Sequence, residues 1–458
     1  MRKGGNKMIH FSSFLGTMAK EGTTVIFHKL HPYPIYVDTN IWEKLKKNPK
    51  KGDKDLIRTL KKRQLIIQSN NKDIEELKKT RIEYGGKIKQ VTNLYLILTR
   101  RCNLKCRYCF ISQAFKEEER KAMMTPEIIK KGIDLWAKHV ARNSMKNIDY
   151  SIIFYGGEPL VNLPTFRIGL EYIQKLQNRG KLPQKNLKKI IITNGILVNK
   201  KIARLFKKHS VEVTVSIDGP VEVHDICRID KAGRGTFKKV QKAMKVLRSE
   251  GISLYASTTI TPYNIGIVKE IPNLFAEMGI KGFGLNKLVG KTLFLLEPEI
   301  DLENYNKQAS QEIINTFLSA RNKGIYEERL GEKADAFIKK EFYPPDCKAY
   351  GGQIVIQPDG QISNCFASSR YNIKHVKECG DNFWIWNTSL PKEWKERLPL
   401  YNAECLNCEA ISICGGGCPW SAEEVKGNPL KKDEAFCIYT KKAFEFLIWD
   451  SYNNHYKD

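Results

Sequence analysis

The chain lacks long apolar runs. None of its 458 residues belongs to a hydrophobic stretch near the roughly 18 residues that a membrane-spanning helix needs. The first 20 residues are basic but contain neither an apolar core nor a small-residue cleavage site, so they do not resemble a secretory signal peptide. We therefore expect a cytoplasmic protein with no membrane partner.

Acidic residues are scarce. The chain has 50 Asp and Glu against 77 Lys and Arg, which gives a net charge of +27. Such an excess is typical of proteins that meet acidic partners, nucleic acid among them. The sequence has no recognition helix with a separate basic face, no zinc-finger His pair and no aromatic RNA motif. We expect no nucleic-acid partner, and either a solvated basic surface or an acidic peptide partner.

Signals for disulfides are also lacking, although the chain has 12 cysteines. Clustered thiols without an export signal indicate a reducing cytosol and metal binding. Cys102, Cys106 and Cys109 follow the spacing C-x3-C-x2-C on a loop after the apolar run Leu94–Leu98. Three thiolates on a 4Fe–4S cube leave one iron open to a small molecule. A zinc knuckle or unrelated buried thiols are the alternatives.

The middle of the chain alternates between strand and helix patterns. Six strands are predicted, at Leu94–Leu98, Tyr150–Phe154, Lys189–Thr193, Val211–Ile217, Ile252–Thr258 and Gly282–Asn286. Helical patterns separate them, at Pro126–Ala141, Pro164–Gln177, Lys200–Lys208, Phe237–Glu250 and Ile265–Met278. Repeated βα units predict an α/β fold with a parallel sheet and helices outside it. Six units are too few for a closed eight-stranded barrel, so we expect a partial (β/α)6 barrel with ligands at the carboxyl ends of its strands.

The remaining segments predict further domains. Residues 1–90 form a small α+β region with strands and short helices, a pattern compatible with peptide binding by strand addition or with a purely structural extension. The predicted boundaries are 91–290 for the barrel, 291–345 for a helical connector, 346–440 for a cysteine-rich module and 441–458 for a C-terminal helix and tail. The module contains Cys347, Cys365, Cys379, Cys405, Cys408, Cys414, Cys418 and Cys437.

The first cysteine triple, with the aromatic Tyr108 before its last member, resembles the signature of the radical S-adenosylmethionine (SAM) enzymes. The resemblance implies that the open iron chelates SAM through its methionine amino and carboxylate groups. It also implies that one electron cleaves SAM to a 5′-deoxyadenosyl radical, which removes hydrogen from a substrate.

Other motifs are similar to the SAM pocket of that family. Tyr155-Gly156-Gly157-Glu158-Pro159 follows the second strand and looks like the GGEP motif that holds the SAM amino group. By the same resemblance Ser216 and Arg228 contact the ribose or carboxylate of SAM, and Val289 packs on the adenine.

The C-terminal cysteines resemble the SPASM module of radical SAM enzymes, which holds two auxiliary 4Fe–4S clusters. The spacing includes Cys347-x12-Gly360-x4-Cys365, and the segment Pro358–Gly360 predicts a β-turn. Two zinc sites are the alternative. The resemblance assigns Cys347, Cys365 and Cys418 to the first auxiliary cluster, and Cys405, Cys408, Cys414 and Cys437 to the second.

Two departures from the family pattern bear on function. The first auxiliary cluster has three assigned cysteines, which predicts either an open iron that binds a substrate thiolate or a fourth ligand from Cys379; Cys227 is the other leftover thiol. Sulfatase-maturating relatives carry an aspartate as catalytic base after the second cysteine, whereas this chain has Phe366.

These features predict a radical SAM/SPASM maturase that crosslinks a ribosomally synthesised precursor peptide, with a Cys thioether as the expected bond. A carbon–carbon or carbon–oxygen crosslink, a formylglycine-type oxidase of sulfatases, and a non-enzymatic iron–sulfur or zinc protein are the alternatives. The expected partners are the precursor peptide, whose leader the N-terminal region would bind, and an electron donor such as flavodoxin or ferredoxin.

Overall fold

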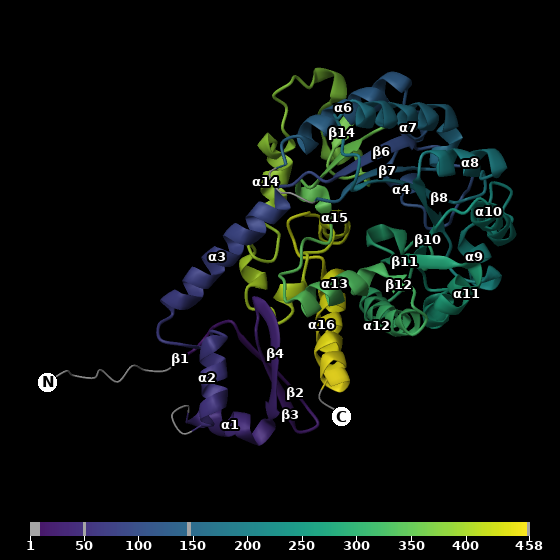
Figure 1. The fold of residues 1–458 in the computed structure, drawn as a ribbon. Coiled ribbons are helices and arrows are strands. Elements are labelled where there is room, and N and C mark those ends of the chain that lie inside the picture. The colour runs from purple at the N-terminus through teal and green to yellow at the C-terminus, as the bar shows by residue number, and fades with distance from the viewer. Residues whose placement is uncertain (1–9, 49–51, 144–147, 456–458) are drawn as a thin grey trace.

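A computed structural model describes residues 10–48, 52–143 and 148–455 of the chain (Figure 1). Its centre is a ten-stranded sheet with the strand order β12-β11-β10-β9-β8-β7-β6-β13-β14-β15. Six neighbouring parallel strands appear in chain order, which confirms the predicted partial barrel. They are β6 (Asn93–Thr99), β7 (Tyr150–Gly156), β8 (Leu187–Thr193), β9 (Val211–Ser216), β10 (Leu254–Ile260) and β11 (Ile280–Lys287).

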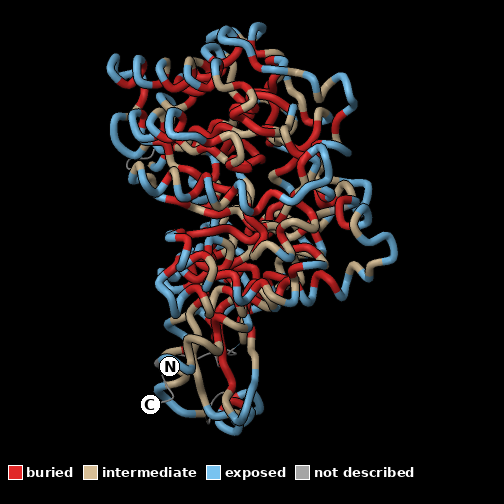
Figure 2. Tube along the Cα trace, turned by 90° about the vertical axis from the view of Figure 1, so that its right-hand side faces the viewer, coloured by how far each residue is buried: buried red, intermediate tan, exposed pale blue. Residues whose placement is uncertain are grey.

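Helices cover the outer face of these strands. They are α6 (Pro126–Val140), α7 (Leu163–Asn178), α8 (Lys200–Lys208), α10 (Phe237–Ser249) and α11 (Ile271–Met278). Alternate strand residues face them: in β9, Val213 and Val215 are fully buried, while Thr214 and Ser216 are half-buried. This period of two directs apolar side chains into the core seen in Figure 2 and polar ones toward the barrel interior.

Both edges of the sheet extend beyond the predicted barrel. Strand β12 (Tyr326–Glu327) joins β11, and the strands β13 (Gln353–Ile356), β14 (Gln361–Ser363) and β15 (Asn372–His375) continue from β6. The β13 strand runs parallel to β6, whereas β13–β14 is an antiparallel hairpin. The predicted turn at Pro358–Gly360 closes that hairpin, with Gly360 at a φ of 90°. The cysteine-rich region therefore shares a sheet with the strand that leads to the first cysteine loop.

The N-terminal region forms a separate three-stranded antiparallel sheet. It consists of β2 (Leu15–Lys20), β3 (Thr23–His28) and β4 (His31–Asp38), with helices α1 (Thr39–Lys47), α2 (Lys54–Lys62) and α3 (Asn71–Ile88). A short pair joins β1 (His10–Phe11) to β5 (Ile66–Ile67). The strands at Thr23–Phe27 and Tyr33–Val37 were expected from the sequence, whereas β1 and β2 were not.

The long C-terminal helix α16 (Glu434–His455) supports the N-terminal sheet. The rings of Phe27 and Phe444 lie 5.0 Å apart, and the hydroxyl of Tyr36 donates to the carbonyl of Ile448 at 2.7 Å. The other helices are α4 (Ile111–Ala114), α5 (Glu117–Arg120), α9 (Val221–Cys227), α12 (Leu302–Arg321), α13 (Glu328–Lys339), α14 (Ser389–Lys395) and α15 (Pro419–Lys426). Across the described residues, no helix has the length and apolar character of a membrane span.

Candidate cluster and cofactor site

The first cysteine loop lies at the carboxyl end of β6. Burial, with smaller contributions from the charges of Cys106 and Cys109, raises the pKa of the Cys102 thiol to about 12, so the three thiols are neighbours. The amide of Leu104 donates to the sulfur of Cys102 at 3.4 Å. Among the described residues no three Cys, His, Asp or Glu side chains converge on a single-ion site.

The two glycines after β7 hold the backbone of this loop. The Gly157 amide donates to the Thr99 carbonyl at 2.8 Å, and the Glu158 amide donates to the Arg101 carbonyl at 2.9 Å. A Cβ on Gly157 would lie 2.3 Å from the Arg101 oxygen, and Gly156 has a φ of 141°. Only glycine permits so close an approach of two chain segments.

Glu158 joins the ends of β7 and β8. Its buried carboxylate accepts hydrogen bonds from the Thr193 hydroxyl and the Asn194 amide, both at 2.8 Å, and from the Leu160 amide at 3.1 Å. Burial raises its pKa to about 7, against the pull of these donors. The side chain is thus a structural tie here, and its contact with a SAM amino group stays a prediction.

Tyr108 and Arg228 meet at a carboxylate that was not singled out from the sequence. Asp218 accepts the Tyr108 hydroxyl at 2.5 Å and the Arg228 Nε at 2.8 Å, and all three residues are buried. Asp218 also accepts the Thr259 amide at 2.9 Å. The pairing uses only one edge of the guanidinium, which leaves its terminal nitrogens for an anionic ligand. The signal for Asp218 was present, since it directly follows a predicted strand end.

Ser216 and Val289 lie apart in the fold. Ser216 ends β9, where it faces the barrel interior beside Ser257 of β10. Val289 packs on the apolar cluster that also includes Cys347 and Cys365, near the C-terminal cysteine region. Their contacts with SAM stay predictions.

A second group of thiols forms around the β13–β14 hairpin. Burial raises the pKa of Cys365 well above the ordinary range, and the charges of Cys347 and Cys418 raise it further. Cys347 acts in the same way on Cys418. These are the three cysteines that the sequence pattern grouped together.

A third group contains the other four C-terminal cysteines. Burial, followed by the charge of Glu434 and with contributions from Cys405 and Cys408, raises the pKa of Cys437 to about 12. The Cys437 charge also acts on Cys414, whose pKa burial raises. The sequence pattern therefore grouped thiols that the fold brings into electrostatic reach of one another.

The surroundings of the thiols fit iron–sulfur clusters. Backbone amides two or three residues ahead donate at 3.4 Å to the sulfurs of Cys102, Cys347, Cys365 and Cys418. Several buried donors beside the C-terminal thiols have no partner among the described residues, namely Arg397 Nε, Trp420 Nε1, Ser412 Oγ and Tyr350 Oη. Cluster sulfurs accept hydrogen bonds of both kinds.

The comparisons with known proteins agree with this geometry. The sequence model of the radical SAM superfamily matches residues 96–274, which include the first cysteine loop and the glycine motif. The chain contains a radical SAM domain.

Relatives of the chain include a cyclopropyl synthase and a sulfatase-maturating enzyme, as their names state. The radical SAM cyclopropyl synthase TigE of Paramaledivibacter caminithermalis is 26% identical over 95% of both chains. A cysteine-type anaerobic sulfatase-maturating enzyme of Clostridium novyi is 24% identical over 78% of this chain and 95% of its own. The structure of Streptococcus suis SuiB bound to precursor peptide SuiA has a TM-score of 0.53 at 17% identity, over 94% of this chain and 100% of that one, and shares the fold.

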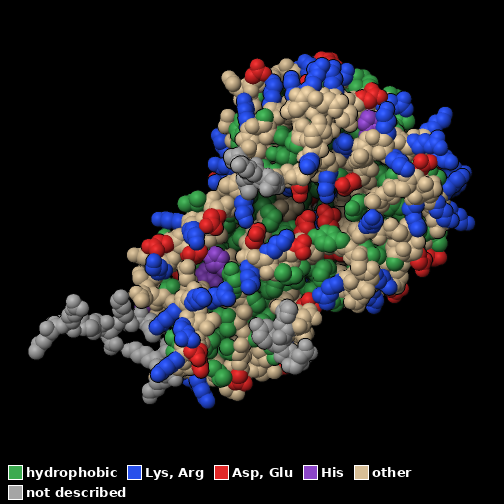
Figure 3. Space-filling view, in the orientation of Figure 1, with side chains coloured by type: hydrophobic (Ala, Val, Ile, Leu, Met, Phe, Trp, Pro, Cys, Tyr) green, Lys and Arg blue, Asp and Glu red, His purple; other side chains and the backbone are tan. Residues whose placement is uncertain are grey.

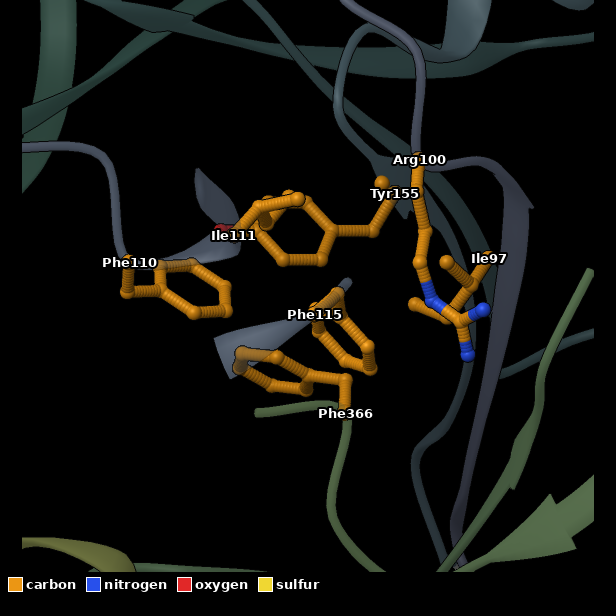
Figure 4. A pocket seen from close by; sticks show the side chains of 8 residues that line it. Ile97, Arg100, Phe110, Ile111, Phe115, Tyr155 and Phe366 are labelled. Atoms are coloured by element: carbon orange, nitrogen blue, oxygen red, sulfur yellow. The ribbon is translucent and has the colours of Figure 1, made fainter. Parts of the chain in front are cut away.

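An aromatic wall of Phe366, Phe110, Tyr155 and Tyr95 packs together, and Figure 4 shows the first three of these side chains lining a pocket. The ring of Phe366 lies 5.3 Å from Tyr95, 5.0 Å from Tyr155 and 6.1 Å from Phe110. Phe366 follows Cys365 directly, and Phe110 follows Cys109. The position where sulfatase-maturating relatives are expected to carry a carboxylate is therefore occupied by an apolar contact.

Carboxylate and guanidinium groups line the other side of the barrel interior and were missed in the sequence. A Cβ on Gly284 of β11 would lie 2.8 Å from an oxygen of Glu328. The neighbouring Arg329 donates to the Asn286 side chain at 2.5 Å and to the Leu285 carbonyl at 3.0 Å. No local motif marks these residues, because they reach the interior only through the pairing of β12 with β11.

Of the two leftover cysteines, Cys379 lies outside the thiol groups, whereas Cys227 lies beside the first one, since the charge of Cys106 acts on it and its carbonyl accepts the Arg107 amide at 3.0 Å. Cys379 follows β15, where its thiol contacts the His375 carbonyl at 3.6 Å and Lys138 of α6 is a neighbouring charge. Cys227 is buried at the end of α9. The structure does not bring Cys379 to Cys347, Cys365 and Cys418, so it offers no support for Cys379 as their fourth ligand.

Proposed function

We propose that this chain is a radical SAM peptide maturase that removes two hydrogens from a ribosomally synthesised peptide and closes a new bond. The observation that carries the proposal is the presence of two further thiol groups in the C-terminal region, one of them at a hairpin of the sheet that also leads to the first cysteine loop. The similarity to a sulfatase-maturating enzyme over 78% of this chain supports a role in modifying polypeptides.

The proposed roles of the first site follow from its contacts. Cys102, Cys106 and Cys109 hold the cluster that binds SAM, and Asp218 orients Arg228 toward the SAM carboxylate. When bound, the cluster supplies the electron that cleaves SAM to methionine and the 5′-deoxyadenosyl radical. The glycine pair keeps the loop pressed against the end of β7, where the three cysteines would hold the cluster.

The proposed auxiliary ligands form two sets. Cys347, Cys365 and Cys418 hold the first cluster, and Cys405, Cys408, Cys414 and Cys437 hold the second. Three cysteines leave one vertex of the first cluster for a substrate thiolate, which supports a Cys thioether as the new bond. The aromatic wall around Phe366 would exclude water from the reacting carbon.

Closure of a carbon–carbon bond is the second candidate. It is favoured by the similarity to TigE, whose name states that it is a cyclopropyl synthase. Formylglycine formation is less well supported, because Phe366 stands where that reaction is expected to need a carboxylate.

The proposed partners are a precursor peptide and a one-electron donor. The three-stranded N-terminal sheet offers edge strands to which a leader peptide would add as a further strand. The SuiB fold, solved with its precursor peptide, supports this assignment. Flavodoxin or ferredoxin is the proposed donor, and the exposed Lys105 and Arg107 on the cysteine loop would attract its acidic surface.

The test is reaction of the anaerobically reconstituted enzyme with SAM, a reductant and the small peptide encoded beside its gene. We expect 5′-deoxyadenosine together with a peptide lighter by about 2 Da, the mass of two hydrogens. Alkylation with iodoacetamide then separates the candidates: a thioether product resists labelling at one cysteine, whereas a carbon–carbon product is labelled in full. A peptide of unchanged mass despite 5′-deoxyadenosine formation would contradict the proposal.

A further inference from the structure

Arg397 is a buried cation without a carboxylate partner in the described part of the chain. It follows α14, and 4% of the residue is exposed. Its terminal nitrogens donate to the carbonyls of Gly417 at 3.3 Å and Lys431 at 3.4 Å. The remaining donor, Nε, is buried and has no partner among the described residues. A buried charge in this condition is costly unless an anion completes its surroundings.

The two carbonyls place the guanidinium between the auxiliary thiol groups. Gly417 precedes Cys418 of the first group, in the glycine loop that begins after Cys414 of the second group. Lys431 belongs to the turn before α16, the helix that carries Cys437. Arg397 therefore contacts the two segments that connect one group to the other.

The positive charge of Arg397 acts on thiols of both auxiliary groups. The charge of Arg397 is within electrostatic reach of Cys347, Cys418 and Cys405. The first two thiols belong to one auxiliary group and the third belongs to the other.

We propose that Arg397 is a positioning residue that serves as the shared countercharge of both auxiliary clusters and donates its Nε–H to a sulfur of one of them. This inference rests on the proposed assignment of the auxiliary cysteines. A nearby cation favours the reduced form of a cluster, which carries one more negative charge, and a hydrogen bond to sulfur has the same sign. Arg397 would thus raise the reduction potentials of both auxiliary clusters. A higher potential would favour the transfer of an electron from the substrate to a cluster.

The first experiment is an EPR-monitored redox titration of reconstituted full-length enzyme, which needs no substrate. In Arg397→Met we expect the ratio of reduced to oxidised auxiliary cluster at a fixed potential to fall at least tenfold, or about 59 mV for one electron. Arg397→Lys keeps the charge and should stay within a few-fold of wild type. Arg321→Met, which removes a partly exposed arginine paired with Asp450, is the matched control and should not shift either potential.

Equal auxiliary potentials in wild type and a fully iron-loaded Arg397→Met would overturn the proposal. If Arg397→Met binds less iron than wild type, a second experiment on wild-type enzyme labelled with 15N-arginine decides whether Arg397 contacts a cluster. We expect a 15N coupling to a reduced auxiliary cluster in its pulsed EPR spectrum, and loss of that coupling in Arg397→Lys. Absence of any coupling in wild type would also overturn the role of Arg397. Wild-type protein that binds zinc in place of iron would instead refute the proposed clusters.

Discussion

At the scale of single residues, the site depends on groups that each satisfy more than one neighbour. Asp218 receives Tyr108, Arg228 and a backbone amide, so one carboxylate orients two residues of the proposed SAM site. Glu158 ties two strand ends together through three donors. Such buried polar groups are stable only when they are fully paired, which is why the loss of one member disturbs the others.

Replacement of one thiol in the first loop tests the radical site directly. Cys106→Ala should abolish 5′-deoxyadenosine formation from SAM, because two thiolates do not retain the cluster with a defined open iron. Cys379→Ala, which removes a thiol outside the three groups, is the control and should retain it. The measurement is chromatography of the nucleoside after reduction with dithionite, and retained cleavage in Cys106→Ala would remove this loop from the mechanism.

At the scale of elements, the cysteine loop is held by the end of the neighbouring strand rather than by its own sequence. In Gly157→Ala the new methyl group would meet the backbone oxygens of Arg101 and Arg100 at 2.3 and 2.6 Å, so the loop must move. We expect SAM cleavage to fall by at least tenfold while the auxiliary clusters still load with iron.

The matched control for this prediction is Gly86→Ala in α3, where a Cβ meets nothing within 4 Å. That variant should cleave SAM like wild type. Mössbauer or EPR spectra of both variants give the cluster content, and normal SAM cleavage by Gly157→Ala would show that the close approach is dispensable.

The contact between α6 and the segment after β15 depends on a neutral histidine. His139 accepts the Ile385 amide at 3.2 Å and stacks on Trp384 at 4.5 Å. Burial lowers its pKa from 6.5 to about 4. Below pH 6.5 the imidazole of His139 binds a proton in the unfolded segment, whereas in the folded segment it stays neutral down to about pH 4. The contact therefore loses stability as the pH falls from 6.5 to about 4, by up to about 3 kcal/mol.

Hydrogen exchange measures this effect locally. Opening of the Ile385 amide, corrected for intrinsic exchange, should increase between pH 6.5 and 5 in wild type. In His139→Phe the protection should be lower throughout and should lose that pH dependence. A pH-independent opening in wild type would show that His139 does not couple this contact to protons.

At the scale of the whole molecule, one sheet links radical generation to the auxiliary thiols. Because β13 pairs with β6, the Cys365 hairpin and the first cysteine loop sit on adjacent strands. A buried link supports this arrangement: Arg100 donates to Gln357 at 2.9 Å, and both residues lie beside those loops. The basic residues are spread over the face seen in Figure 3, in keeping with a solvated basic surface.

Separate cluster sites predict separable defects. Cys365→Ala should leave SAM cleavage within a few-fold of wild type, because the first loop is intact, but should block formation of the modified peptide. The measurement is paired: 5′-deoxyadenosine by chromatography and peptide mass by spectrometry. Normal amounts of modified peptide would exclude the first auxiliary cluster from the reaction.

Much of the fold was predictable because its signals are local. The six barrel strands follow from short apolar runs, and turn residues such as Gly360 mark the hairpin in the cysteine-rich region. The three thiol groups were predictable from spacing and family resemblance together. The strands β12 and β13 were not, since each is too short to show a pattern and is defined only by its partner.

The sequence by itself determined the spacing of the cysteines, from which family resemblance predicts three thiol groups, because spacing along a chain limits which sulfurs one cluster can reach. Only the tertiary structure decided that Asp218 orients Arg228, that Glu328 reaches the barrel interior, and that Arg397 lies between the auxiliary groups. These contacts join residues whose neighbours are brought in by strand pairing and loop packing, and burial then gives each charge its effect.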